Sequence, residues 1–124
     1  MLPPLPYGGG GNTVSYARGF GEVLPCFLLG EAEQRRDTFA SAIRIGEPVH
    51  REEVGHVVDR SGGQIVSLSD ADLERAWRSL AREEGIFCEP ASAAGIAAID
   101  AAGLRDVRIV CVVTGHGLKD TDAV

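Results

Sequence analysis

Several features that mark common protein classes are missing or scarce in this sequence. No apolar run approaches the length needed to cross a bilayer, which excludes a membrane-spanning helix. No basic cluster is larger than Arg35-Arg36 and the formal net charge is −6, so nucleic acids and anionic membrane surfaces are poor partners. Lysine occurs only at Lys119, so chemistry that needs a lysine has a single candidate in this chain.

The sequence also lacks the patterns of disulfide-rich, metal-binding and secreted proteins. Its three cysteines are odd in number, far apart and flanked by apolar residues, which predicts reduced thiols. The three histidines form no HxH, HExxH or Cys/His ligand pattern, so we expect no metal. The Pro-rich start has neither the cationic nor the apolar region of a signal peptide. We therefore expect a cytoplasmic protein.

What is present is an ordinary globular composition with alternating strand and helix patterns. The 124 residues are 44% hydrophobic and 24% charged, enough for one soluble domain. Alternating elements of this kind predict an α/β fold with a mostly parallel sheet flanked by helices. The predicted strands are 1–7, 23–29, 64–68 and 107–113, and the predicted helices are 12–19, 52–60, 70–84 and 90–101.

Individual residues refine this prediction. Pro3, Pro4 and Pro6 remove three backbone donors from the first strand, which a central strand tolerates badly. The β-branched run 107–113 predicts a parallel strand buried on both faces. Trp77 belongs to an apolar stripe at helical spacing and is expected in the core. The stretch from Glu31 to Thr38 is expected to be charged and exposed.

The most informative stretch is Gly8-Gly9-Gly10-Gly11-Asn12, which runs into a helix-compatible segment. Four consecutive glycines expose backbone N–H groups with no Cβ in front of them. Together with a helix N-terminus, such amides form a site for an anion, most often phosphate. Asn12 is also a favourable N-cap for the helix that follows. A flexible linker or a tight turn is the alternative interpretation of the glycines alone.

Four segments together resemble the fold-type II pyridoxal-phosphate-dependent enzymes, and among them the threonine synthases most closely. The segments are 6–13 (PYGGGGNT), 41–48 (SAIRIGEP), 85–94 (GIFCEPASAA) and 113–120 (VTGHGLKD). The resemblance covers 5–120 and implies a single C-terminal segment, 1–124, of the large domain of such an enzyme. It implies an incomplete domain of the tryptophan synthase beta type, with pyridoxal 5'-phosphate as cofactor.

The resemblance also implies roles for residues on these segments. The loop Gly8, Gly9, Gly10, Gly11 and Asn12 would form the phosphate cup, with amides in place of basic side chains. Thr114 corresponds to the residue that meets the pyridine nitrogen. A hydroxyl there cannot keep the nitrogen protonated as a carboxylate would, which suits elimination and replacement chemistry better than transamination.

Three further residues have implied roles near the cofactor or the substrate. Ala42 would approach the cofactor through its backbone. Glu89 would either lie near the cofactor ring or cap the helix that begins at Pro90. Arg44 stands in an apolar context and is either an ion-pair partner or a contact for the substrate's phosphate.

The sequence departs from the family at its central residue. The family holds its cofactor as a Schiff base with a lysine, and Lys119 does not match that position. The resemblance therefore implies that this chain has no catalytic residue of its own, that the lysine belongs to an absent N-terminal half, and that the chain alone is inactive. With that half supplied, the implied lyase would convert O-phosphohomoserine and water to L-threonine and phosphate in threonine biosynthesis. A homodimer is a further expectation, because dimers are common among the relatives.

Three alternatives remain at this point. The chain could belong to the serine/threonine dehydratases of the same superfamily. It could be a non-catalytic remnant that keeps the family's sheet. It could also be a dinucleotide-binding module, with Gly8 and Gly10 opening a helix and Glu31 placed about 20 residues later to bind a ribose.

Overall fold

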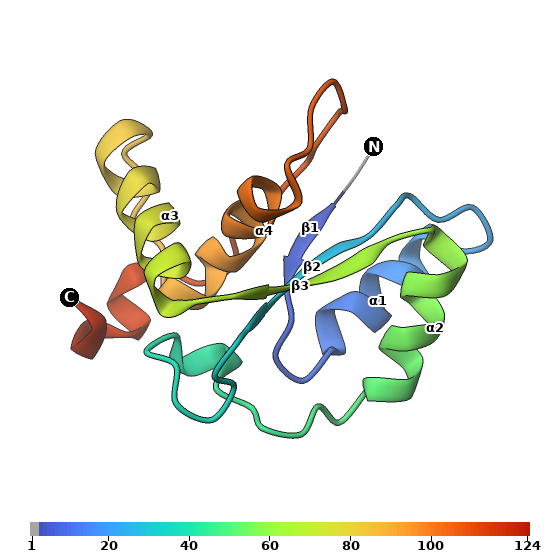
Figure 1. The fold of residues 1–124 in the computed structure, drawn as a ribbon, viewed down its shortest axis with the longest axis horizontal. Coiled ribbons are helices and arrows are strands. Elements are labelled where there is room, and N and C mark those ends of the chain that lie inside the picture. Colours follow the sequence, from blue (N-terminus) through green and yellow to red (C-terminus); the bar gives the residue numbers. More distant parts are fainter. Residues whose placement is uncertain (1–2) are drawn as a thin grey trace.

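The computed structural model describes residues 3–124 and has the α/β architecture that the sequence predicts (Figure 1). Its sheet contains β1 (Pro4–Pro6), β2 (Leu28–Ala32) and β3 (Gln64–Leu68), in the order β1-β2-β3. Both strand pairs are parallel, as expected for strands joined by helical crossovers. Met1 and Leu2, predicted to begin the first strand, lie outside the described residues.

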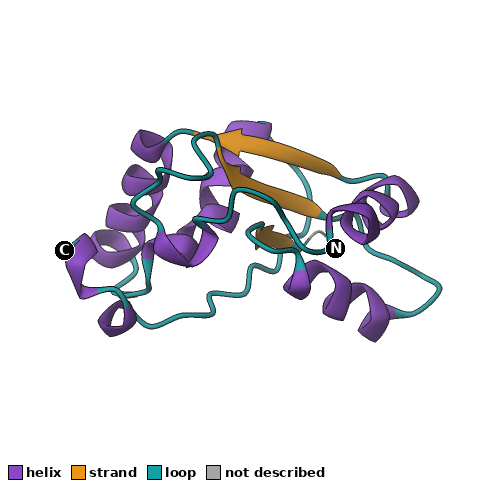
Figure 2. Cartoon of the chain, turned by 90° about the horizontal axis from the view of Figure 1, so that it is seen from below, coloured by secondary structure: helices purple, strands orange, loops and turns teal. Residues whose placement is uncertain are grey.

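Two pairs of helices cover the two faces of this sheet (Figures 1 and 2). One face packs against α1 (Gly11–Phe20) and α2 (Arg51–Ser61), and the other against α3 (Asp70–Glu83) and α4 (Ala94–Ala102). The pleat of β2 serves both layers, because successive side chains of a strand point to opposite faces. Leu29 belongs to the cluster that contains Val14 and Val54, whereas Leu28 packs with Ala98 of α4.

The small residues of α4 allow its backbone to approach the sheet closely. A Cβ added to Gly30 in β2 would lie 2.5 Å from the carbonyl oxygen of Ala94, so only glycine fits there. The 3-10 turn η2 (Pro90–Ala93) leads into this helix, as the proline at its start predicts. The predicted 90–101 helix is therefore a short 3-10 turn followed by α4, which ends at Gly103 in the left-handed conformation.

Helix α3 is the element that the sequence predicts most closely. The Ser69 hydroxyl accepts a hydrogen bond from the Asp72 N–H at 3.1 Å, and the Ser69 N–H donates to the Asp72 carboxylate at 3.3 Å. Trp77 is buried as predicted, and its Nε1–H donates to the carbonyl of Cys88 at 2.6 Å. The Trp77 indole therefore fixes the segment that leads into η2.

Several predicted boundaries are wrong. The second strand begins at Leu28 and continues through Ala32, so most of 23–29 lies outside it. Helix α1 is capped by Gly10 instead of Asn12, since the left-handed turn at Gly10 starts the helix two residues earlier. The stretch predicted to be exposed includes a buried Thr38, which donates to the Asp70 carboxylate at 2.5 Å.

The predicted strand 107–113 does not form. Val107 and Val110 are each 49% exposed instead of buried on both faces. The segment passes beside β1, where the Cys111 Sγ lies 3.6 Å from the carbonyl oxygen of Pro4. Tyr7 donates its N–H toward β2, so the alternate positions, Pro4 and Pro6, face the outer edge of β1. Because proline has no N–H, that edge offers no donors for a strand ladder.

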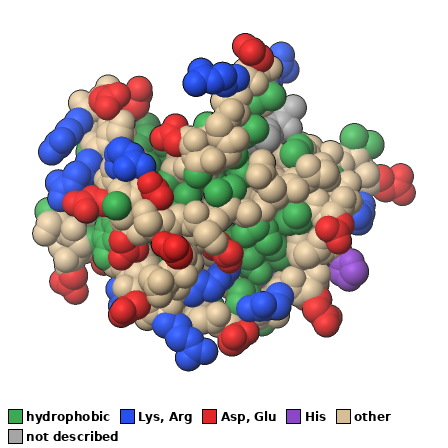
Figure 3. Space-filling model, in the orientation of Figure 1, with side chains coloured by type: hydrophobic (Ala, Val, Ile, Leu, Met, Phe, Trp, Pro, Cys, Tyr) green, Lys and Arg blue, Asp and Glu red, His purple; other side chains and the backbone are tan. Residues whose placement is uncertain are grey.

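Charge is spread over the surface without a basic patch on the face seen in Figure 3. Within residues 3–124, no helix is both long and apolar enough to cross a membrane. The three cysteines are free thiols, as predicted, with Cys88 buried and the other two partly exposed. Burial raises the pKa of the Cys111 thiol to about 11, so this group stays protonated at neutral pH.

Candidate functional site

A pocket of about 250 Å³ lies beyond the carboxyl end of β1, the usual place for a ligand in an open parallel α/β sheet. Its walls come from the glycine loop after β1, the 3-10 turn η1 (Ser41–Ile43), the η2 turn and the segment after 107–113. Its lining consists of Pro6, Gly8, Gly9, Gly10, Gly11, Asn12, Ala42, Ile43, Glu89, Ala91, Ser92 and Thr114.

The glycine loop presents unpaired backbone donors to this pocket. The carbonyl of Gly9 accepts from the His50 N–H at 3.1 Å, and the carbonyl of Gly10 accepts from the Val14 N–H at 3.2 Å. In a trans peptide the next N–H points the opposite way, so the N–H groups of Gly10 and Gly11 point away from these partners. The N–H groups of Gly9, Gly10 and Gly11 make no backbone hydrogen bond to other described residues. Consecutive free amides at the start of α1 are suited to bind an anion.

Two of these glycines are required for different reasons. Gly10 has a φ of 94°, and a Cβ there would lie 2.6 Å from the Cγ2 of Val54. Gly11 has open space around a built Cβ, with no heavy atom within 4 Å. Gly10 therefore shapes the turn, whereas the bare Gly11 leaves room in the pocket.

A hydroxyl pair forms the opposite wall. The Ser92 Oγ accepts a hydrogen bond from the Gly115 N–H at 2.9 Å and lies 3.1 Å from the Thr114 Oγ1. Ser92 is fully buried, so it holds the turn that carries Thr114. Thr114 itself is exposed at the pocket surface.

Glu89 completes this wall. It is 7% exposed, and its N–H donates to the Gly115 carbonyl at 2.9 Å. A Cβ at Gly115 would overlap the Glu89 carboxylate, so glycine is needed to admit this side chain. The Glu89 side chain makes no capping hydrogen bond to the turn that follows, so its predicted capping role is not formed. It instead presents a carboxylate at the pocket surface.

The pocket thus gathers every residue that the sequence analysis assigned to the cofactor. Arg44, assigned to the substrate, does not line it. The Arg44 side chain is exposed, and its Nε–H donates to the Thr38 carbonyl at 2.7 Å. Among residues 3–124 it forms no ion pair, so the predicted ion-pair role is not formed either. Lys119 is also exposed and outside the lining.

Two residues that support the site were missed by sequence reasoning. Ser92 was noted only as part of its segment, and nothing local indicates that its hydroxyl meets Thr114. Arg35 was placed in an exposed stretch, yet its side chain is only 14% exposed and its Nη1–H donates to the Gly8 carbonyl at 3.1 Å. The four-residue spacing between Glu31 and Arg35 was the one available signal for this contact.

The titratable groups beside the pocket favour binding over acid–base or thiol chemistry. Burial raises the pKa of Tyr7, and the neighbouring Arg35 guanidinium partly opposes this. Burial also raises the pKa of the Cys88 thiol, with a further contribution from the adjacent Glu89 charge, so Cys88 is not an activated nucleophile. Over the described part of the chain, no group of three or more His, Cys, Asp or Glu side chains could hold a metal ion.

The chain belongs to the family of pyridoxal-phosphate-dependent enzymes, because the model of that family matches residues 5–115. Enzymes of this family use pyridoxal phosphate as their cofactor.

Within this family the chain is most informatively compared with threonine synthases. It is 36% identical over 142 aligned residues to the threonine synthase of Synechocystis, covering 95% of this chain and 37% of that protein. It is 48% identical to that of Methanocaldococcus jannaschii over 92 residues, covering 70% of this chain and 23% of the relative. For Mycobacterium tuberculosis the identity is 37%, covering 95% and 39%. The chain therefore spans between about a quarter and two fifths of the length of these relatives.

Solved structures agree on the fold. The pyridoxal-phosphate-bound threonine synthase of Brucella melitensis superposes with a TM-score of 0.75 at 14% identity, covering 99% of this chain and 37% of that one. A threonine deaminase from T.th. gives 0.74 at 23% identity, covering 94% and 45%. At these identities the likeness establishes the fold-type II architecture alone.

These findings bear unequally on the alternatives. The dinucleotide-binding interpretation needed Glu31 as a ribose acceptor, but Glu31 pairs with Arg35 at 2.7 Å and does not line the pocket. The dehydratase interpretation shares the fold, whereas the relatives that are 36–48% identical in sequence are threonine synthases.

Proposed function

We propose that this chain provides the cofactor-binding wall of a threonine synthase-type enzyme, with pyridoxal 5'-phosphate in the pocket described above. The observation that carries the proposal is the meeting of four distant sequence segments at one pocket. Residues from 6–13, 41–48, 85–94 and 113–120 all line it, and these are the segments that carry the family resemblance.

The lining fits a phosphorylated pyridine ring. The Gly9, Gly10 and Gly11 amides are free donors at a helix N-terminus, where a phosphate dianion is favourable without a basic side chain. Ala42 and Ala91 present small side chains between the two ends of the pocket. Thr114 lines the same pocket as these amides, so one ligand could contact both.

The residues also limit the chemistry that this wall supports. Bound pyridoxal phosphate supplies electron withdrawal from the α carbon of an amino acid. Because Ser92 accepts from Gly115 and can donate to Thr114, the Thr114 hydroxyl is free to donate its own proton toward the ring nitrogen. A neutral hydroxyl keeps that nitrogen unprotonated, which favours elimination and replacement over transamination.

The proposed reaction of the whole enzyme is conversion of O-phosphohomoserine and water to L-threonine and phosphate. This rests on the similarity to threonine synthases. Lys119 lies outside the pocket lining, so we propose that the amine that carries the cofactor comes from beyond these 124 residues. An N-terminal half with a lysine is the partner this requires, and the chain alone is inactive.

Binding is tested by titrating the purified chain with pyridoxal phosphate and following Trp77 fluorescence and cofactor absorbance. Gly11→Ala should fold normally, since its Cβ meets no atom, but should weaken binding about tenfold by placing a methyl group in the phosphate position. The control Gly19→Ala lies in the same helix with equally open surroundings and should bind like the wild type. Equal affinity of the Gly11 variant and the wild type would contradict the proposal.

The missing amine is tested by adding pyridoxal phosphate and reducing with borohydride. We expect no stoichiometric adduct, only weak labelling of Lys119 and the N-terminus, since the sole lysine side chain is exposed and outside the lining. O-phosphohomoserine should release no phosphate with the chain alone. A stoichiometric adduct at Lys119 in peptide mass spectrometry would overturn this part of the proposal.

A further inference from the structure

Arg35 joins the two backbone walls of the pocket. Its Nη1–H groups donate to the Gly8 carbonyl at 3.1 Å and to the Ile45 carbonyl at 3.0 Å. Gly8 begins the glycine loop, and Ile45 follows the η1 turn that carries Ala42. One guanidinium therefore fixes the separation between the glycine loop and the η1 segment.

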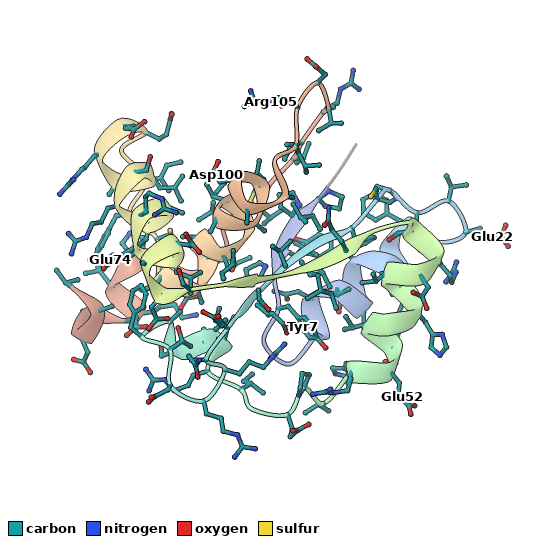
Figure 4. All side chains as sticks on the ribbon, in the orientation of Figure 1. Tyr7, Glu22, Glu52, Glu74, Asp100 and Arg105 are labelled. Carbon is teal, nitrogen blue, oxygen red and sulfur yellow. The ribbon has the colours of Figure 1, made fainter. Side chains whose placement is uncertain are left out.

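The Arg35 side chain is itself held from three directions. Its Nε and Nη2 donate to one carboxylate oxygen of Glu31 at 3.0 and 2.7 Å, from β2. Its Cζ lies 4.5 Å from the centre of the Tyr7 ring, which follows β1 near the middle of the molecule (Figure 4). Because both supports come from the sheet, the sheet sets the position of the guanidinium.

The bond to Gly8 controls where the next amide points. A peptide group is planar and its C=O and N–H are antiparallel, so drawing the Gly8 oxygen toward Arg35 turns the Gly9 N–H away from it. His50 and Val14 fix the following two peptide groups in the same way. Of these three anchors on the loop, Arg35 is the one supplied by a side chain.

We infer that Arg35 is a positioning residue that holds the Gly8–Gly11 loop with its amides turned into the pocket for a phosphate group. It does not line the pocket, so it acts through the backbone of Gly8 and Ile45. The phosphate part of this inference rests on the function proposed above. A lysine at this position would keep the charge but could not reach Gly8, Ile45 and Glu31 together, because it lacks the planar fork.

The test compares the full-length wild type with Arg35→Lys and with Arg51→Met. Arg51 is the matched control, because it is also a cation near Tyr7 but pairs with Glu47 at an exposed site. Without ligand, the 15N order parameters of the Gly9, Gly10 and Gly11 amides should fall below about 0.6 in Arg35→Lys. They should stay near about 0.85 in the wild type and in Arg51→Met.

With ligand, Arg35→Lys should weaken binding of pyridoxal phosphate about tenfold and leave binding of pyridoxal, which lacks the phosphate, unchanged. Arg51→Met should change neither affinity by more than about twofold. A merely structural role for Arg35 would weaken both ligands equally, and that result would overturn the inference.

Each remaining outcome decides between the two proposals. Rigid glycine amides in Arg35→Lys, or mobile amides with unchanged pyridoxal phosphate affinity, would also overturn the inference. If the wild type binds neither ligand, the proposed function fails, and the order parameters alone decide whether Arg35 holds the loop. If Arg35→Lys does not fold, Glu31→Gln, which weakens the same clamp from its partly exposed end, replaces it in both measurements.

Discussion

Gly10 is the residue at which the chain turns from β1 into α1. Its φ of 94° is open to glycine at little cost, and its missing side chain leaves space for Val54 from α2. The orientation of the amides on either side depends on this turn. The loop is therefore built by backbone geometry, with the core helix α2 packed directly beneath it.

Replacing Gly10 by alanine should destabilise the protein by about 2–4 kcal/mol. This figure combines the strain of a positive φ with overpacking against Val54, each worth roughly 1–3 kcal/mol. Urea denaturation followed by circular dichroism measures this as a lower midpoint at unchanged slope. Gly19→Ala, with no atom within 4 Å of its Cβ, should instead be neutral or stabilising. Equal midpoints for the Gly10 variant and the wild type would show that the turn at Gly10 is not required.

At this scale the sequence reveals residues whose type is distinctive, and it conceals those whose role depends on distant partners. The four glycines and Thr114 could be assigned because their segments resemble a known family. Arg35 and Ser92 could not, since their partners Gly8, Ile45 and Thr114 are brought to them only by the fold.

Elements with local signals at both ends were predicted well. Helix α2 was predicted at 52–60 and runs from Arg51 to Ser61, ending at a left-handed Gly62. The strand 64–68 was predicted with its observed bounds. By contrast, 107–113 has the composition of a buried strand but lies beside the proline-bearing edge of β1. Composition describes what a segment favours, whereas a strand also needs a neighbour with free donors and acceptors.

The N-terminus of α3 provides a pH-dependent test at this scale. The Ser69 hydroxyl, followed by Arg75, holds the pKa of Asp72 below its usual range. A lowered pKa contributes stability that is present above the unfolded value near 3.8 and is lost as the pH falls through the folded value. Asp72→Asn should therefore cost about 1 kcal/mol at pH 7.

The stability difference between Asp72→Asn and the wild type should narrow as the pH falls below about 4, where the wild-type carboxyl becomes protonated. Urea denaturation at pH 7, 5 and 3 measures it. Asp59→Asn, which removes an exposed carboxylate from the C-terminal turn of α2, should show no loss at pH 7. A deficit for Asp72→Asn that is constant with pH would contradict the role of its charge.

For the whole molecule, the site depends on bringing four segments to the carboxyl end of β1. The parallel order β1-β2-β3 places the glycine loop beside the turn that follows β2, and the segment leading into α4 carries Glu89 and Ser92 to the opposite wall. The sequence predicted the fold class because strand and helix patterns alternate. It could not predict the pocket itself, which depends on the packing of η1 and η2 across the loop.

The comparisons define the family, while the share of each relative covered defines the scope of the proposal. The chain spans 37% of the Synechocystis threonine synthase, and the residues that we assign belong to the cofactor wall. Turnover is accordingly assigned to the whole enzyme, and cofactor contact to the described residues.

The central claim is that the glycine amides and the Thr114 end of the pocket contact one molecule of pyridoxal phosphate. Backbone amide NMR of the 15N-labelled chain tests this directly during titration with pyridoxal phosphate and, separately, with inorganic phosphate. We predict that inorganic phosphate shifts the resonances of Gly9, Gly10 and Gly11 alone, whereas pyridoxal phosphate shifts these and those of Thr114 and Gly115 with the same binding constant. Shifts confined to one end, or two ends that saturate with different constants, would contradict this claim.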